Sequence, residues 1–260
     1  MTARTETKQA ITHLSFTRLK NLADCPAALK AYIERDEPAT KAMNEGSLLD
    51  CLLFTPEEME TRFYVMPKVS RQSNAGKAEF AAHIEAAGNK IVVNEEQVAD
   101  AQFLCHAISQ NATVAEHGLL NPEFFKFQVQ VNFPRSGFFH RGVKDADGHR
   151  RDGVRCIWDL KRMGNARGEY LVRKQIKDSK YALQAAIYCY ELDEANEHVE
   201  YYVIAVDNKG YVTPFRIGKD ARMQARYEWN KLIGAAHRCN MEGLDAGPEF
   251  WAGPQGFFEF

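Results

Sequence analysis

The spacing of apolar residues changes near Pro122 and divides the chain into two parts. Before it, the segments FTRLKNLADC, AALKAYIER and SLLDCLLF repeat apolar residues every three or four positions, which predicts helices. Ser15 stands where a helix cap is expected, and Pro26 stands at a favoured first helical position. Residues 77–87 and 95–109 predict two more helices, separated by a short strand at KIVV.

Beyond Pro122 the apolar residues alternate with polar ones, which is typical of strands with one buried face. The segments FKFQVQV, FFHRGVK and CIWDLK predict three antiparallel strands, and DADG predicts the turn between the last two. A helix over 180–194, a hairpin of VEYYVIAV and YVTPFRI, and a helix over 219–241 follow. This order predicts an α/β fold in one compact domain, with a helical N-terminal part over 1–120 and a core over 121–260.

The charges are nearly balanced overall but uneven along the chain. Lys plus Arg number 33 and Asp plus Glu number 35, so the net charge of −2 implies neither a nucleic-acid nor a membrane partner. The segment 141–180 holds twelve basic and six acidic residues, a local excess of +6. Such a segment is typical either of a surface that binds a polyanion or of solvated helix and loop faces.

The six cysteines and the lack of long apolar runs predict the compartment. Neighbouring cysteines stand 26 or more residues apart, which argues against a zinc ribbon or a clustered iron–sulfur site and favours reduced core thiols. The N-terminal segment lacks the apolar core of a signal peptide, and no run is long enough to cross a membrane. We therefore expect a cytoplasmic protein without a membrane partner.

The segment CIWDLK places two charges inside an apolar strand. Asp159 and Lys161 are two residues apart, so their side chains project from the same face. Such a pair is most often an ion pair on a solvated face. Here the apolar neighbours place it in a low dielectric, where a divalent cation would offset the carboxylate and the amine could orient or deprotonate a water molecule.

A metal site of this kind needs a second carboxylate from a neighbouring strand. Asp145 is favoured because it ends the preceding strand, whereas Asp147 precedes Gly148 as a turn residue should. Asp152 is a further candidate, and the strand register needed to choose between it and Asp145 does not follow from the sequence. Two carboxylates without a nearby His or Cys ligand favour Mg²⁺, with Mn²⁺ as a substitute, over zinc.

Five landmarks in order make the chain similar to a known family. VKD, followed fourteen residues later by DLK, resembles the PD-(D/E)xK nuclease signature. The segments LSFTRLKNLADCPAALKAYI, MNEGSLLDCLLFTPEE, YVMPKVSRQSNAGKAEF, SGFFHRGVKD and YALQAAIY resemble the RecE-type, exonuclease VIII family over about residues 13–190. The resemblance implies a restriction-endonuclease-like PD-(D/E)xK core, a mixed central sheet flanked by helices, with a helical N-terminal elaboration.

The resemblance also implies roles for individual residues. Asp145 and Asp159 match the metal-binding acids, the Leu160 carbonyl is a further metal ligand, and Lys161 matches the catalytic lysine. Gln184 and Tyr188 match a Q-x-x-x-Y pair placed beside the active site. The expected contacts to DNA are Arg141, Lys144, Arg162, Arg173 and Lys174.

Three positions depart from the family pattern. Asp50 stands where relatives carry His, and it is either a replacement metal ligand or a plain surface carboxylate. Gln128 and Gln130 occupy the first core strand, where relatives often carry an acid. Arg162 follows the catalytic lysine where relatives tend to have Thr.

By resemblance, the expected activity is Mg²⁺-dependent exonuclease digestion of linear double-stranded DNA from its ends. The expected direction is 5′ to 3′, which leaves a 3′ single strand for an annealing protein in recombination. Family members form rings, so a homo-oligomer encoded by a bacterium or a phage is expected. The alternatives are a structure- or sequence-specific endonuclease on the same core, and a catalytically weakened DNA-binding module.

Overall fold

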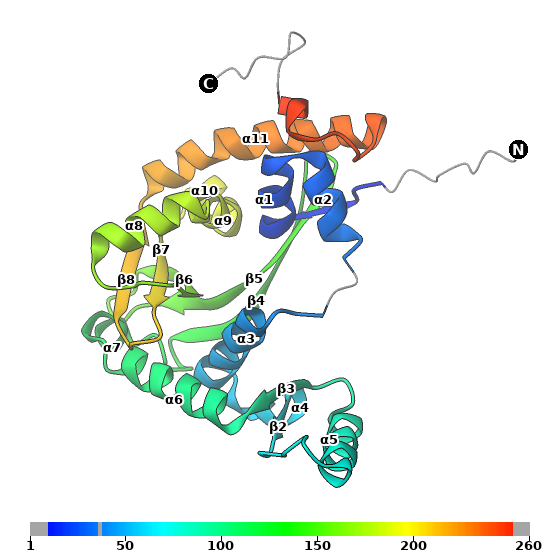
Figure 1. Ribbon diagram of the computed structural model, residues 1–260. Coiled ribbons are helices and arrows are strands. Elements are labelled where there is room, and N and C mark those ends of the chain that lie inside the picture. The colour runs from blue at the N-terminus through cyan, green and yellow to red at the C-terminus, as the bar shows by residue number, and fades with distance from the viewer. Residues whose placement is uncertain (1–9, 36–37, 252–260) are drawn as a thin grey trace, which may run out of the picture.

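The protein is built around a six-stranded mixed sheet, seen in a computed structural model that describes residues 10–35 and 38–251 (Figure 1). Its strands are β1 (His13–Ser15), β4 (Phe125–Arg135), β5 (Phe138–His149), β6 (Arg155–Arg162), β7 (Val199–Val206) and β8 (Val212–Ile217). Their order is β1-β5-β6-β7-β8, and β4 also pairs with β5. The pairs β1–β5 and β6–β7 are parallel and the other pairs are antiparallel. The predicted mixed α/β class is thus confirmed.

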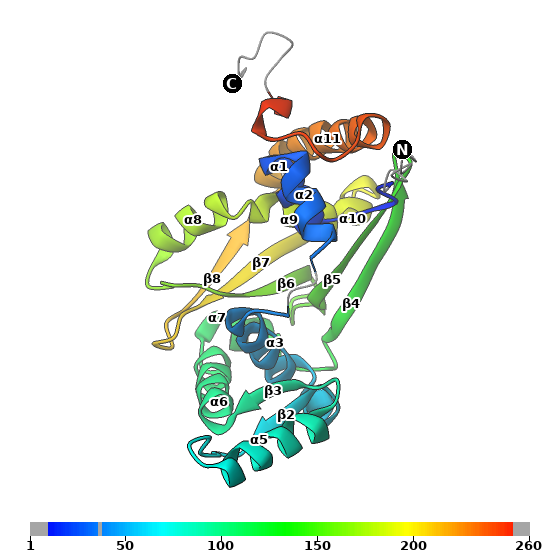
Figure 2. The ribbon, with the colours of Figure 1, turned by 45° about the vertical axis from the view of Figure 1, so that its right-hand side comes forward.

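Helices cover both faces of this sheet. One face carries α1 (Phe16–Asp24), α2 (Pro26–Ile33), α8 (Glu169–Asp178), α9 (Tyr181–Tyr188), α10 (Tyr190–Glu194) and α11 (Lys219–Glu242), which share the larger apolar core with the sheet. The opposite face carries α3 (Lys41–Phe54), α6 (Glu95–Ser109) and α7 (Ala112–His117) over a second core (Figure 2). A short 3₁₀ helix, η2 (Pro248–Trp251), follows α11.

A small lobe projects from the α3 and α6 side (Figure 2). It contains η1 (Pro56–Glu58), α4 (Met59–Arg62), β2 (Phe63–Met66), α5 (Asn74–Ala87) and β3 (Ile91–Asn94). β2 and β3 form a separate two-stranded parallel sheet, which packs through Phe63 and Val93 against Leu48 of α3 and Ala101 of α6. The sequence predicted α5 and β3 but not β2.

Sequence motifs at helix ends predicted several helix boundaries correctly, but one predicted turn is wrong. The Ser15 side chain accepts the backbone N–H of Arg18, and Pro26 opens α2, as predicted. The predicted turn at DADG is wrong, because β5 continues through these residues and Gly148 pairs with Cys156 of β6. The chain reverses at residues 150–154 instead, and the helix predicted over 180–194 is divided into α9 and α10 at Cys189.

Two compositional expectations can be compared with the described residues. All six cysteines are free, and four of them are buried, in agreement with the predicted reduced thiols. Across residues 10–35 and 38–251, the helices are either too short or too polar to cross a bilayer.

One edge of β5 is divided between two partners, and the division leaves a gap. β1 pairs with Phe139–Arg141, and β6 pairs with Ala146–His149. Between them, residues 142–145 have no strand partner on this edge among the described strands, whereas β4 pairs along the other edge. The backbone of residues 142–145 therefore forms an open edge of the sheet, and side chains from β5 and β6 can meet there.

Candidate active site

The gap in the β5 edge brings together the three charged residues predicted to carry the chemistry. The Ala146–Trp158 pair, continued by one residue, sets Asp145 opposite Asp159. The Asp145 Oδ2 atom accepts the backbone N–H of Leu160 at 2.6 Å, in place of a strand partner. Asp159 is 1% exposed and forms an ion pair with Lys161.

The negative charge in this group is only partly compensated. Burial, and then the charge of Asp159, raise the pKa of Asp145 well above its ordinary value. Burial also raises the pKa of Asp159, although Lys161 opposes the shift. Burial lowers the pKa of Lys161, but the two carboxylates outweigh it and hold that pKa above its usual range. A single ammonium thus faces two carboxylates that repel each other.

Helix α9 closes the site from the side of the larger core. The Gln184 Nε2 atom donates to Asp159 Oδ1 at 2.8 Å, so the predicted glutamine does reach the predicted acid. Tyr188 packs against Gly142, where an added Cβ would lie 2.6 Å from the Tyr188 ring. Tyr181, which was not predicted, places its ring centroid 5.3 Å from the Lys161 Nζ atom. Its spacing of three from Gln184 and seven from Tyr188 puts it on the same helix face, and this was the signal available in the sequence.

Asp50 and Gln128 form a pair at the opposite side of the site. The Gln128 Nε2 atom donates to both Asp50 carboxylate oxygens at 3.0 Å. Gln128 would pair with Asp145 in the β4–β5 register, and its backbone is left-handed with φ of 53°. Burial raises the pKa of Asp50 to about 6, to which the charge of Asp159 contributes while Arg62 and Gln128 oppose it. A neutral amide that orients Asp50 therefore occupies the position where an acid was expected.

The donors at the gap match a hard divalent cation in type. The carboxylates of Asp145 and Asp159 supply oxygen ligands, and a cation between them would remove their mutual repulsion. The N–H and C=O of one strand residue point to the same side, so the Leu160 carbonyl faces the same edge as its N–H. Among the described residues, no three His, Cys, Asp or Glu side chains are grouped closely enough to hold a metal, so two carboxylates form the core of any such site.

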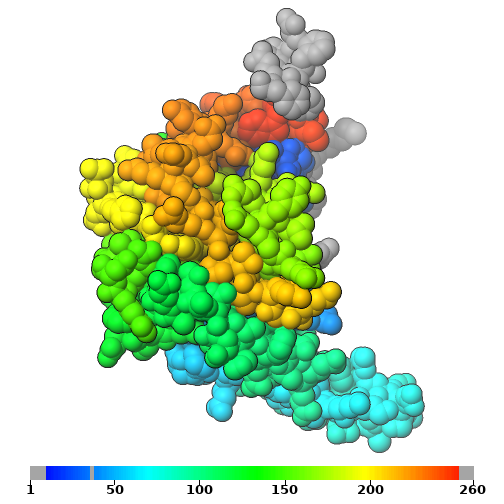
Figure 3. Space-filling view, turned by 90° about the vertical axis from the view of Figure 1, so that its left-hand side faces the viewer, coloured from blue at the N-terminus to red at the C-terminus, as the bar shows by residue number. Residues whose placement is uncertain are grey.

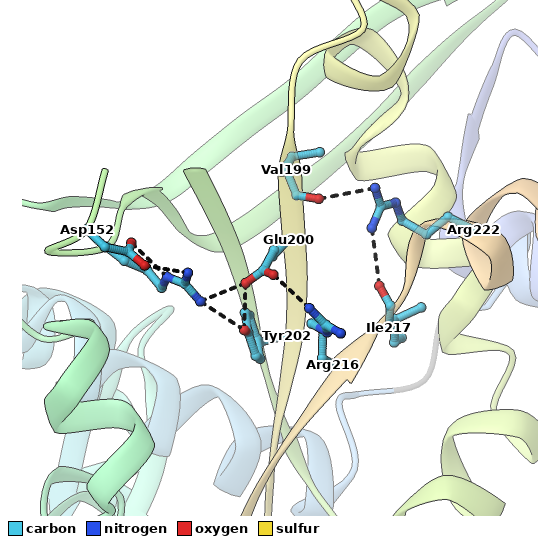
Figure 4. A network of polar contacts seen from close by, with 8 residues as sticks. Asp152, Val199, Glu200, Tyr202, Arg216, Ile217 and Arg222 are labelled. Carbon is cyan, nitrogen blue, oxygen red and sulfur yellow. Dashed lines mark hydrogen bonds and ion pairs between the residues drawn. The ribbon is translucent and has the colours of Figure 1, made fainter. Parts of the chain in front are cut away.

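Asp152, the alternative to Asp145 as the second carboxylate, lies away from the gap. It is exposed in the turn between β5 and β6 and forms an ion pair of 2.6 Å with Arg150. Arg150 also pairs with Glu200, which accepts from Tyr202 and Arg216 (Figure 4). Asp152 therefore belongs to a network of polar contacts at the start of β7, and Asp145 is the second carboxylate beside Asp159.

The residues predicted to contact DNA differ in how exposed their side chains are and in whether they already pair with an acid. Lys144 is 8% exposed and pairs with Asp147 at 2.7 Å, a buried position that does not suit a contact with phosphate. Arg162 is half-buried and binds Glu45 of α3 at 2.6 Å and Asn208 at 2.9 Å. Arg173 and Lys174 are exposed on α8, as a role in binding requires.

Arg141 is exposed on β5 and has basic neighbours that the sequence did not reveal. His13 and Arg18 lie close enough that Arg18 and Arg141 lower the pKa of His13, after the larger effect of burial. Burial and Arg141 likewise lower the pKa of Arg18, although Tyr32 opposes them. His13 and Arg18 line a pocket of about 480 Å³ beside β1. Arg18 and Arg141 are thus two neighbouring cations, and their mutual repulsion favours the binding of an anion beside His13.

Comparison with known proteins supports the fold. No family model matches the chain, and no curated protein matches it. The crystal structure of a "putative exonuclease" from Eubacterium rectale superposes with a TM-score of 0.60 at 11% identity, covering 89% of this chain and 82% of that one. A crystal structure of SSO0001 aligns with a TM-score of 0.31 at 11% identity, covering 84% of this chain and 85% of that one. The chain thus shares its fold with the Eubacterium rectale protein.

Proposed function

We propose that the protein is a metal-dependent deoxyribonuclease with a PD-(D/E)xK core. The observation that carries the proposal is the meeting of Asp145, Asp159 and Lys161 at the open edge between β5 and β6. The shared fold with a protein described as an exonuclease supports the same class. The two neighbouring cations Arg18 and Arg141 suit a phosphate-rich substrate.

Each residue at the site has a proposed part in phosphodiester hydrolysis. Mg²⁺ or Mn²⁺, held by Asp145, Asp159 and the Leu160 carbonyl, would lower the pKa of a bound water and offset charge on the phosphate. Lys161, held as an ammonium by its two carboxylates, orients the attacking water and stabilises developing negative charge. Gln184 fixes the Asp159 carboxylate, and Tyr188 lines the phosphate position. The Asp50 carboxylate is held by Gln128 and is not grouped closely with the other two acids, so its part as a further metal ligand stays a prediction.

The finer activity is proposed from the RecE-type landmarks in the sequence. The protein would digest linear duplex DNA from 5′ to 3′ and leave a 3′ single strand for an annealing protein. It would act in the cytoplasm as a homo-oligomer, in a ring by resemblance. The alternative of a weakened DNA-binding module is favoured by one observation, the neutral Gln128 at the expected acid position.

Digestion of end-labelled linear duplex and closed circular duplex, each with Mg²⁺ or EDTA, tests the activity. We expect loss of linear DNA only with the metal, and loss of this activity in Lys161→Ala and Asp159→Asn. Asp152→Asn is the matched control, because this carboxylate is exposed and remote from the gap. Intact linear DNA with both Mg²⁺ and Mn²⁺, or a fully active Lys161→Ala protein, would contradict the proposal. Cutting of the circle would favour the endonuclease.

A further inference from the structure

Helix α8 presents an exposed face on which an aromatic ring precedes three cations. Val172 and Ile176 are its buried residues and pack into the larger core. A stripe at spacings of three, four and seven residues consists of Tyr170, Arg173, Lys174 and Lys177, and all four are exposed. We refer to these four residues as the α8 face. α8 lies at the molecular surface beside β8 (Figure 3).

The aromatic member of the α8 face is unusually accessible. Tyr170 is 77% exposed, more than the other large apolar or aromatic side chains that the structure describes. Nearby, the Arg167 guanidinium lies 5.3 Å from the ring centroid of Tyr211, which is 42% exposed at the start of β8. Tyr211 thus contacts Arg167 in space, and Tyr170 follows Arg167 by three residues in the sequence.

Most of the cations here lack acidic partners. Arg173 pairs with Glu169 on its own helix. In the part of the chain that the structure describes, Lys174 and Lys177 form no ion pair. Of the other cations in the segment 162–180, Arg162 pairs with Glu45 and Lys180 with Glu228, so among the described residues Arg167, Lys174 and Lys177 are the three without an ion pair. Uncompensated cations interleaved with exposed aromatic rings match a chain of phosphates that also offers unpaired bases.

We propose that the α8 face, together with Arg167 and Tyr211, binds single-stranded DNA. Lys174, Lys177 and Arg173 contact phosphates, and Tyr170 stacks on a base. Duplex DNA does not use this surface in the same way, because its bases are already stacked on one another. The proposal rests on the proposed function for the choice of DNA, and Arg167 lies in the loop that joins β6, which carries Lys161, to α8.

The stacking contact is tested by binding of a fluorescently labelled oligothymidine to the full chain in EDTA, measured by anisotropy. Tyr170→Ala should weaken binding by about fivefold or more, since a base–aromatic stack contributes roughly 1–3 kcal/mol. Tyr170→Phe keeps the ring and should retain wild-type affinity. Tyr227→Ala on α11 is the matched control, because Tyr227 is 70% exposed but only one of the residues three or four positions away, Lys231, is a cation.

The phosphate contacts are tested by salt dependence. Lys174→Gln with Lys177→Gln should reduce the slope of log affinity against log salt by about 0.7 for each phosphate that the variant no longer neutralises. Lys90→Gln is the control, because Lys90 is exposed next to β3 in the small lobe, and it should leave the slope unchanged. Thermal unfolding of every variant confirms that a loss of binding does not come from a loss of folding.

The outcomes separate this proposal from the nuclease assignment. An unchanged affinity of Tyr170→Ala, or an equal loss in Tyr227→Ala, would overturn the single-strand surface even if the wild type cleaves DNA. Tyr170-dependent binding by a wild type that cleaves nothing would uphold the surface and remove the nuclease. Binding of blunt duplex that is stronger than binding of the single strand, and equally sensitive to Tyr170→Ala, would also overturn it.

Discussion

Asp145 and Asp147 lie two residues apart on β5, yet their surroundings respond to a negative charge in opposite ways. Burial raises the pKa of both carboxyls. At Asp147 the hydrogen bonds from Arg155 and Lys144 outweigh burial, and the pKa is lowered. At Asp145 the nearby charge of Asp159 adds to burial, and the pKa is raised. The comparison teaches that the balance between neighbouring cations and neighbouring carboxylates, and not burial alone, decides whether the pKa of a carboxyl on this strand is raised or lowered.

The largest expected effect is a difference in the rate of DNA cleavage between variants of Asp145 and variants of Asp147. Asp145→Asn should lower the rate of DNA cleavage on the order of 10²–10³-fold, because a buried group that acts on the transition state is removed. Asp147→Asn should leave the rate per folded molecule within a few-fold of wild type. Initial rates on linear duplex at saturating Mg²⁺ measure both. Equal losses in the two variants would remove the distinction.

For stability we expect the opposite result, with the larger loss in Asp147→Asn and the smaller in Asp145→Asn. Asp147→Asn leaves Lys144 buried without its carboxylate partner, and breaking such a pair should lower the free energy of unfolding by about 3 kcal/mol. Asp145→Asn removes a repelling charge and should not lower the free energy of unfolding in EDTA. Urea denaturation of both variants measures the difference. A large destabilisation by Asp145→Asn would show that its carboxylate is already compensated.

The pH dependence of stability extends the comparison to Asp50. Its folded pKa of about 6 lies above the ordinary 3.8, so the folded state holds the proton more tightly than the unfolded state. The contribution of Asp50 to stability in EDTA should therefore fall as pH rises from about 4 to 6, by at most about 3 kcal/mol. Asp50→Asn should make the fall in stability smaller, and the raised pKa values of Asp145 and Asp159, which act with the same sign, should leave the rest of it. Asp147, with its lowered pKa, has the opposite sign, and its contribution is lost as pH falls below 3.8.

The smallest effect concerns the backbone of Gln128. Gln128→Ala and Gln128→Gly both remove the hydrogen bonds to Asp50, but only glycine adopts a φ of 53° without strain. The glycine variant should therefore be more stable than the alanine variant by about 1 kcal/mol, as measured by urea denaturation. If alanine proved the more stable of the two, the left-handed conformation would not be strained.

The sequence predicted those features that depend on neighbouring residues, and it predicted less well the contacts between residues far apart in the chain. Alternating apolar residues and helix caps predicted the sheet and most helices, because these depend on neighbours within a few positions. DADG has the composition of a turn, but Ala146 is fully buried and the β6 partner extends the strand through it. The contact between Asp50 and Gln128 joins residues 78 positions apart, and nothing local in the sequence reports it.

The divided edge of β5 has a consequence for the order in which the molecule is made. One border of the gap is β1, at residues 13–15, and the other is β6, which begins 140 residues after Ser15. β6 pairs with β5 across the short turn at residues 150–154, whereas β1 pairs with residues 126 positions further along the chain, and this contact forms late because closing a long loop is entropically unfavourable. The gap is therefore completed late on a nascent chain, and a protein cut short before β6 lacks both Asp159 and Lys161.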